Sequence, residues 1–188
     1  MHHKLPSNPR GLQRHNGNMP TITKKILGRA VRLVRKMDLA QRAQLLDEIH
    51  AHQPNLLYSA LALRRFGASY EQLEVVLNIL LVCFEAMKLA GTERNVIDEA
   101  LQERCLARIT GKMRFLEGLP SGQMDEAVMA SMADHPEIWL LAFVIDDLKT
   151  RELIRIRTDT EKFVVLAALN IVESIAEAAL PKATPKKS

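Results

Sequence analysis

The sequence predicts an all-α, single-domain helical bundle of about seven to eight helices. Two runs of ten residues, 75–84 and 163–172, are apolar except for Asn78 and Asn170. Runs without a polar face are typical of central core helices, and each asparagine is expected to bond to backbone or to polar groups at a seam of the body. Aromatic residues make up only 4% of the chain, which favours helix over sheet. At 188 residues, the chain is long enough to fold as one domain without disulfides or metals.

The positive charge is concentrated at the two ends of the chain. Residues 1–36 contain nine Lys and Arg and no acid, and residues 181–188 contain three Lys and no acid. All 22 acidic residues and the other 14 basic ones lie in 37–180, which therefore has a net charge of −8. The low apolar content of residues 1–20 predicts a flexible basic arm, followed by a helical domain over 21–180 and a basic C-terminal tail over 181–188.

The first predicted helix, over residues 22–37, is amphipathic. One half of it is apolar, and the other half carries six cations: Lys24, Lys25, Arg29, Arg32, Arg35 and Lys36. One interpretation is a surface helix with a solvated basic face, and Gly28 in its middle indicates that it needs tertiary support. The other is a face that binds phosphates, an anionic membrane or an acidic partner.

Capping and turn residues predict the remaining helices. Three of them follow in the first half: 39–52 after an Asp38–Gln41 capping box, 54–66 from Pro54 to Gly67, and 70–90 between Ser69 and Gly91. Four are expected in the second half: 92–110 capped by Thr92, 121–133 capped by Ser121, 134–149 capped by Asp134 with Pro136 in its first turn, and 159–180 after the capping box at 158–161. A brief extended segment is expected over 151–157, where charged and β-branched residues alternate.

The sequence leaves open an internal duplication into two pseudo-symmetric halves, 38–117 and 121–180. Residues 54–63 resemble residues 136–145 at a constant offset of 82, and each segment is followed by one of the two apolar runs. The breaking residues Gly111, Gly118, Pro120 and Gly122 mark the seam between the halves.

The same offset suggests an interface between the halves or between two subunits. It places Arg64 and Arg65 opposite Asp146 and Asp147, and opposite charges at equivalent positions are what a two-fold contact requires. The alternative is that all four side chains are solvated helix ends, whose ion pairs contribute little to stability.

No motif for catalysis, a metal or a cofactor is found, so the sequence argues against an enzyme without settling the matter. Glu48 and His52 could share an ion, but His50 points to another face of the helix and two ligands do not make a site. None of the glycines forms a phosphate-binding loop, and Ser121 does not lie in a nucleophile elbow. A dispersed active site, for which Cys105 is a conceivable thiol, stays open.

We therefore expect a non-catalytic helical interaction or adaptor module, self-associating as a homo-oligomer, whose basic N-terminal helix engages an acidic partner. The alternative is a nucleic-acid-associated protein that binds phosphates non-specifically through the same helix and the basic arm. The two ten-residue apolar runs are too short to span a membrane, and the N-terminus shows no signal peptide. A cytoplasmic, bacterial protein is the simplest expectation.

Overall fold

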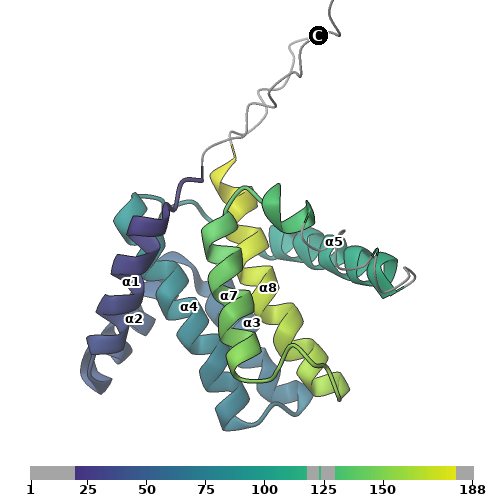
Figure 1. The fold of residues 1–188 in the computed structure, drawn as a ribbon. Coiled ribbons are helices and arrows are strands. Elements are labelled where there is room, and N and C mark those ends of the chain that lie inside the picture. The colour runs from purple at the N-terminus through teal and green to yellow at the C-terminus, as the bar shows by residue number, and fades with distance from the viewer. Residues whose placement is uncertain (1–19, 118–122, 124–129, 181–188) are drawn as a thin grey trace, which may run out of the picture.

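Eight helices and no strand are present in the residues that the structure, a computed structural model, describes, namely 20–117, 123 and 130–180. The all-α, single-domain bundle is therefore confirmed (Figure 1). The helices are α1 (Lys24–Lys36), α2 (Leu39–His52), α3 (Pro54–Ala62), the 3-10 helix η1 (Leu63–Phe66), α4 (Tyr70–Ala90), α5 (Glu99–Glu117), α7 (Ile138–Thr150) and α8 (Asp159–Ala179). The predicted arm and tail, and most of the predicted helix 121–133, lie outside the described residues.

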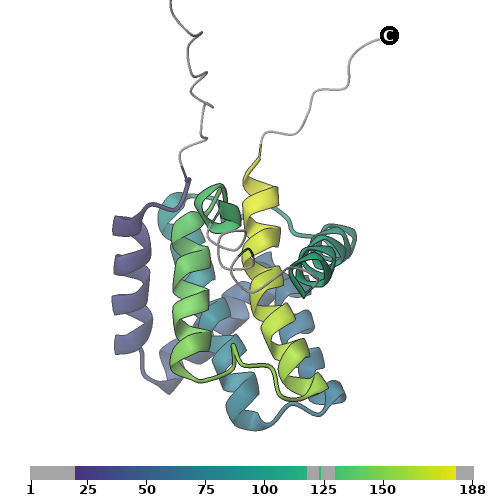
Figure 2. The same cartoon turned by 45° about the vertical axis from the view of Figure 1, so that its right-hand side comes forward.

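Helices α4 and α8 form the centre of the bundle, as predicted for the two apolar runs. They pack against each other; α4 buries more than half of its side chains, including Phe84, and α8 buries nearly half, including Ile171. Helix α1 covers α4 on one side, and α5 covers α8 on the other (Figure 2). In the part of the chain that is described, no helix is both long and apolar enough to cross a membrane.

The helices that pack on α4 and those that pack on α8 make similar contacts. Helix α3 packs on α4 and touches α8, whereas α7 packs on α8 and touches α4. The outer helices α1 and α5 hold the same relation to their central partners. A unit duplicated over 24–90 and 99–179 would produce this pattern. The predicted halves, 38–117 and 121–180, divide the chain differently, since α1 lies outside both and α5 lies in the first, and the duplication stays a hypothesis.

Helices α2 and α4 begin where the sequence places their caps, and α1 begins at Lys24, two residues after the predicted start at 22. Thr23 accepts a hydrogen bond from Ile26 N at the start of α1, which is slightly shorter than the predicted 22–37. Asp38 forms the expected capping box with Gln41, and Ser69 forms another at the start of α4. Each cap satisfies amide groups that have no partner inside the helix.

The predicted helix 54–66 is divided in two. The α-helical part ends at Ala62, and the last turn tightens into η1 before Gly67. Gly67 has a φ of +83°, the left-handed conformation that glycine adopts most easily, so the predicted stop is correct.

The predicted start of the next helix at Thr92 is wrong, because α5 begins at Glu99. The amide of Thr92 donates to Met87 O and so completes the C-terminal turn of α4, while Asp98 caps α5 by accepting from Leu101 N. The fully buried side chain of Gln53 holds the intervening loop in place by donating to the carbonyls of Glu93 and Asn95 and accepting from Ile97 N.

Gly111 does not break a helix, which corrects the predicted end at 110. It lies inside α5, which continues to Glu117, and no other group lies within 4 Å of the position its Cβ would occupy. An isolated glycine costs a helix about 1 kcal/mol, which the packing of α5 on α8 can offset.

Two further expectations for the second half are wrong. Helix α7 starts at Ile138 rather than at an Asp134 cap, because Pro136 and Glu137 form a turn in which the Glu137 carboxylate accepts from Thr21 N and Ile22 N. Residues 151–157 form turns instead of an extended segment, with Glu152 at a φ of +58°.

The two asparagines of the apolar runs have different environments. Asn78 is half-buried, so the first run does have a partly exposed position. Asn170 is buried, but its side-chain oxygen has no hydrogen-bond partner, contrary to the expectation for a core amide.

Candidate functional site

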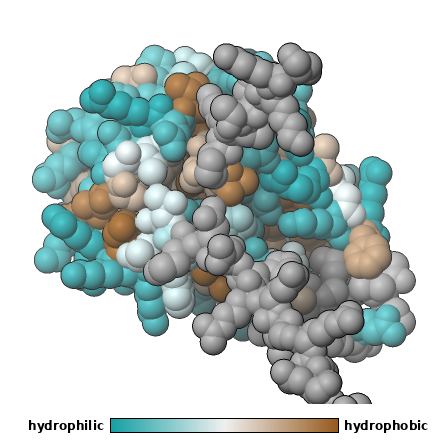
Figure 3. All heavy atoms as spheres, turned by 90° about the horizontal axis from the view of Figure 1, so that it is seen from above, coloured by the Kyte–Doolittle hydropathy of each residue, from teal (hydrophilic) through white to brown (hydrophobic). Residues whose placement is uncertain are grey.

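The face that the sequence singles out is formed by α1 on the outside of the bundle. Leu27, Ala30 and Val34 are buried against the core, so the helix is docked along its apolar stripe. Seen from above (Figure 3), hydrophilic residues dominate the left-hand edge of the molecule, the side on which α1 lies in Figure 1. We call the following six exposed side chains the cationic face: Lys24, Lys25, Arg29, Arg32, Arg35 and Lys36.

None of the six cations forms an ion pair with a carboxylate of the described residues. Only Lys24 has a charge-related contact, with its Nζ 5.4 Å from the centre of the Trp139 ring. The cations of α5 differ, because Arg108 and Lys112 reach Glu173 on α8 at 3.2 and 3.5 Å. Cations of the outer helix α5 are therefore neutralised by carboxylates of α8, whereas those of the outer helix α1 have no carboxylate partner among the described residues.

The spacing of the cationic face makes it a continuous stripe. Lys25, Arg29, Arg32 and Lys36 follow one another at intervals of four, three and four, so neighbours lie on the same side of the helix. The stripe is about 17 Å long at 1.5 Å per residue. Like charges at this spacing repel by a few tenths of a kcal/mol per pair, a cost that a bound anion would remove.

The start of α1 is also unfavourable for a free helix. Its first turn contains Lys24 and Lys25 and no acid, although the positive end of the helix dipole favours carboxylates there. Arg35 and Lys36 in the last turn suit the negative end of the dipole, so the unfavourable charge is confined to the start of the helix, and packing on α4 can offset it. The pattern does suit an anion that approaches from solvent.

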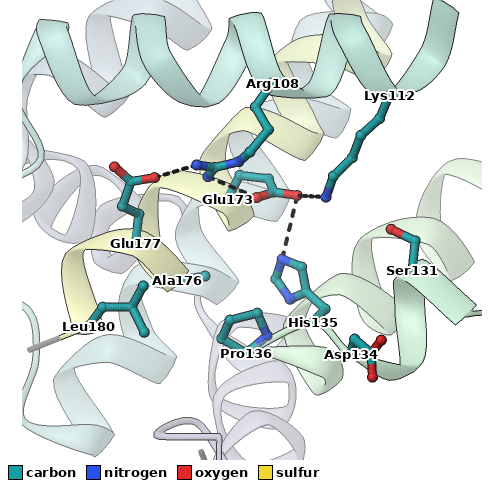
Figure 4. Close-up of a pocket in the computed structure, with 10 residues that line it drawn as sticks. All are labelled: Arg108, Lys112, Ser131, Asp134, His135, Pro136, Glu173, Ala176, Glu177 and Leu180. Carbon is teal, nitrogen blue, oxygen red and sulfur yellow. Dashed lines mark hydrogen bonds and ion pairs between the residues drawn. The ribbon is translucent and has the colours of Figure 1, made fainter. Parts of the chain in front are cut away.

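A second polar region lies between α5, α8 and residues 131–136, around a cavity of about 410 Å³ (Figure 4). Arg108 binds two acids of α8, with its guanidinium 3.2 Å from Glu173 and 2.7 Å from Glu177. These ion pairs hold the pKa of Glu177 below its usual range, chiefly through the hydrogen bond from Arg108. Each cation here already has a carboxylate partner, so the cluster links α5 to α8. We call its residues, Arg108, Lys112, Glu173 and Glu177, the clasp.

His135 closes the inner side of this clasp. Its Nδ1 accepts from Glu137 N, so in the neutral ring the proton is on Nε2, which lies 3.7 Å from Glu173 Oε1 without a hydrogen bond. Burial lowers the pKa of His135, and Arg108 and Lys112 add to this effect, while Glu173 opposes it. The ring is therefore held neutral at neutral pH.

The lowered pKa predicts that the protein loses stability in mild acid. The unfolded chain takes up a proton at His135 below about pH 6.5, whereas the folded chain resists it, so the free energy of unfolding falls as pH decreases through that value. Denaturant unfolding between pH 7.5 and 5.5 should show a smaller pH dependence for His135→Asn than for the wild type. The control is Gln44→Asn, which alters an exposed side chain that does not titrate and should leave the wild-type slope unchanged. Equal slopes for His135→Asn and the wild type would contradict the assignment.

The cysteines are not placed as reactive thiols. Cys83 is buried in α4, and burial raises its pKa to about 12. Cys105 lies 3.4 Å from an Arg108 nitrogen and 3.6 Å from Glu177 Oε2, but burial and the Glu177 charge still raise its pKa. Neither has the lowered pKa of a nucleophilic cysteine.

The other candidate residues for an active site are kept apart. Glu48 forms an ion pair with Lys88 at 2.5 Å, His50 bonds to the Tyr58 hydroxyl at 2.7 Å, and His52 stacks on Phe84. Among the described residues, no three His, Cys, Asp or Glu side chains gather closely enough to hold a metal ion.

Two of the four residues of the predicted interface, Arg64 and Asp147, have other partners within the chain. Arg64 donates to Ala68 O and lies over the Tyr70 ring, and Asp147 pairs with Arg151 at 3.4 Å. Arg65 and Asp146 are exposed. Contact between these residues of two subunits stays a prediction.

Three polar features escaped the sequence reasoning: the Gln53 bridge, the Glu137 bridge and the α5–α8 clasp. The spacing of the clasp residues, at intervals of four on both helices, was a usable signal. The two bridges had none, because their partners are backbone groups 40 to 116 residues away.

Comparisons with known proteins found no matching family model, no matching curated protein and no matching solved structure. The function therefore has to be inferred from the chain's own residues.

Proposed function

We propose that this protein is a non-catalytic interaction module that binds the acidic surface of a partner protein through the cationic face of α1. The observation that carries the proposal is the combination of six exposed cations with no carboxylate partner among the described residues. A stripe of this kind raises the local concentration of anionic partners and their association rate.

The chemistry of the stripe favours an acidic protein over a nucleic acid that is read by sequence. The exposed half of α1 carries Lys and Arg, which bind phosphates and can also contact guanine, but it has no Asn or Gln that would contact adenine and no aromatic residue that would stack on a base. An acidic helix with Glu or Asp at every third or fourth position has the same repeat as the stripe.

A second candidate is non-specific binding to nucleic acid. In the sequence, residues 1–19 precede α1 and residues 181–188 follow α8, and the start of α1 and the end of α8 lie at the same end of the molecule (Figure 2). This placement supports a shared contribution of both basic segments and α1 to phosphate binding.

One experiment tests the proposal and separates the two candidates. We would measure by fluorescence anisotropy how the full chain binds a helical peptide with Glu at four-residue intervals, duplex DNA and single-stranded RNA, at low and physiological salt. The variant Arg29→Gln/Arg32→Gln/Lys36→Gln should lose about ten-fold or more in affinity, equivalent to about 1.4 kcal/mol. The control Arg114→Gln/Lys149→Gln/Arg155→Gln removes the same charge from exposed positions elsewhere and should bind within about two-fold of the wild type.

The outcomes are distinct. Tight, α1-dependent binding of the acidic peptide supports the adaptor. Binding only to DNA and RNA supports the second candidate instead. In that case, the slope of the logarithm of the binding constant against the logarithm of the salt concentration should decrease in size by about one for each cation removed. If neither the acidic peptide nor either nucleic acid binds, or if the two triple variants lose equal affinity, the cationic face is not the binding surface.

Self-association is the other part of the proposal. The exposed rings of Phe66 and Phe163 support it, since they lie together with their centres 4.9 Å apart near the exposed Arg64 and Arg65. Aromatic residues and arginine are enriched at protein–protein interfaces. Light scattering over a range of protein concentrations measures the oligomeric state directly. If the protein is a monomer at every concentration, the proposal of self-association is wrong.

A further inference from the structure

A cavity of about 400 Å³ lies between α3, α5 and α8, on the opposite side of the bundle from α1. Its size is in the range of small-molecule sites. Apolar surface makes up most of its lining, and the polar residues that reach it include Tyr58 and Ser59 from α3, Glu99, Gln102 and Glu103 from α5, and Asn170 from α8. No Lys or Arg is among the residues that line it.

Asn170 is the feature of this cavity that packing does not explain. It is 8% exposed, its Oδ1 has no partner, and no hydrogen bond within the described residues holds its amide. An unpaired amide in a core helix costs about 1 to 3 kcal/mol. Asparagine is therefore an expensive choice there unless another molecule supplies the partner.

Asn170 can be compared with the other buried polar atoms that lack a partner. Of the described residues with such an atom, Asn170 and His135 each line a cavity. His135 already faces Glu173 within the clasp, whereas the Asn170 side chain makes no hydrogen bond within the described residues. Because nothing fixes the amide, it can turn either its oxygen or its nitrogen towards a ligand.

The charge of the cavity decides which ligand it suits. Glu99 and Glu103 lie one turn apart on α5, both exposed, and neither pairs with a cation of the described residues. The Tyr58 ring, which also lines the cavity, offers a face to which a cation is attracted. Two carboxylates and an aromatic ring without a competing cation favour a positively charged group.

We propose that this cavity binds a small organic cation, an aliphatic amine or diamine whose ammonium group lies between Glu99 and Glu103 and whose other polar end reaches Asn170. The buried Gln102, which also lines the cavity, provides a further polar group on the way. This site is separate from the cationic face and does not depend on the function proposed for α1.

The test uses 1,4-diaminobutane as the probe and 1,4-butanediol, a neutral molecule of similar shape, as its control. Calorimetric titration of the full chain should show binding of the diamine and at least about ten-fold weaker binding of the diol. Glu99→Gln/Glu103→Gln should lose about ten-fold in affinity for the diamine. The matched control Glu71→Gln/Glu74→Gln removes two exposed acids from α4 and should keep the wild-type affinity within about two-fold.

Asn170→Leu provides a readout that does not depend on charge. It should weaken diamine binding several-fold while leaving the melting temperature of the free protein unchanged or raised, because it removes an unpaired amide. The proposal is overturned if the diamine does not bind at about 10 mM, if the diol binds equally well, or if both double variants lose the same affinity. It is also overturned if Asn170→Leu lowers the melting temperature, since the amide would then serve the fold.

Discussion

Replacing Gln53 with leucine should lower the free energy of unfolding by about 3 kcal/mol or more. The Gln53 amide is 0% exposed, donates to Glu93 O and Asn95 O at 2.8 Å each, and accepts from Ile97 N at 3.1 Å. Leucine has a similar volume but leaves three backbone groups without their partner, and each costs about 1 to 3 kcal/mol when it stays buried. Chemical denaturation followed by circular dichroism measures the loss.

A matched variant within α2, the helix that Gln53 directly follows, separates this effect from a general sensitivity of that helix to substitution. Gln44→Leu changes an exposed glutamine and should shift the stability by no more than about 0.5 kcal/mol. Hydrogen exchange should also quicken at the Ile97 amide in Gln53→Leu and not in Gln44→Leu. If Gln53→Leu costs less than about 1 kcal/mol, the bridge does not hold the loop.

The Gln53 bridge also explains why the sequence could predict the limits of α4 but not the start of α5. The limits of α4 follow from local signals, since Ser69 and Gln72 form its capping box and Gly91, with a φ of +73°, ends it. Thr92 is an equally good cap by type, but its amide completes the last turn of α4. The start of α5 is delayed to Glu99 because Gln53, about 40 residues earlier, binds the loop. Local patterns carry no record of such a partner.

The same distinction applies to the candidate sites. The cationic face was predictable because one helix contains all of it, and the 3.6-residue period assigns each residue to a side. The cavity at Asn170 combines three helices, and no periodicity within α3, α5 or α8 indicates that they meet there. Asn170 stood out in the sequence only as a polar interruption of an apolar run, which did not show what it faces.

Glu137→Ala should weaken the attachment of α1 and cost about 2 to 4 kcal/mol of stability. The Glu137 carboxylate is 2% exposed and accepts from Thr21 N and Ile22 N, both at 3.0 Å, immediately before α1 begins. Alanine leaves both amides without an acceptor, and hydrogen bonds to a charged group are worth about 1.5 to 3 kcal/mol each. The substitution also removes the unfavourable burial of the carboxylate, which offsets part of the loss.

The pH dependence of this bridge has the opposite sign to that of His135. Burial raises the pKa of Glu137, against the two amides that lower it, so the folded protein holds the proton more tightly than the unfolded chain does. Stability from this group is therefore greatest below about pH 4.3 and decreases as pH rises through the folded pKa. Glu137→Ala should remove this contribution, whereas His135→Asn should leave it in place.

The bridge also connects stability with the proposed binding surface. Because Glu137 joins the start of α7 to the start of α1, its loss should increase hydrogen exchange at Ile22 and along the first turn of α1 before the core opens. Binding of the acidic peptide should then weaken, although every cation of the face is still present. Asp134→Ala, which alters an exposed acid three residues away, should change neither quantity. If Glu137→Ala leaves exchange at Ile22 unchanged, then packing on α4 alone holds α1 in place, and the cationic face does not depend on the carboxylate.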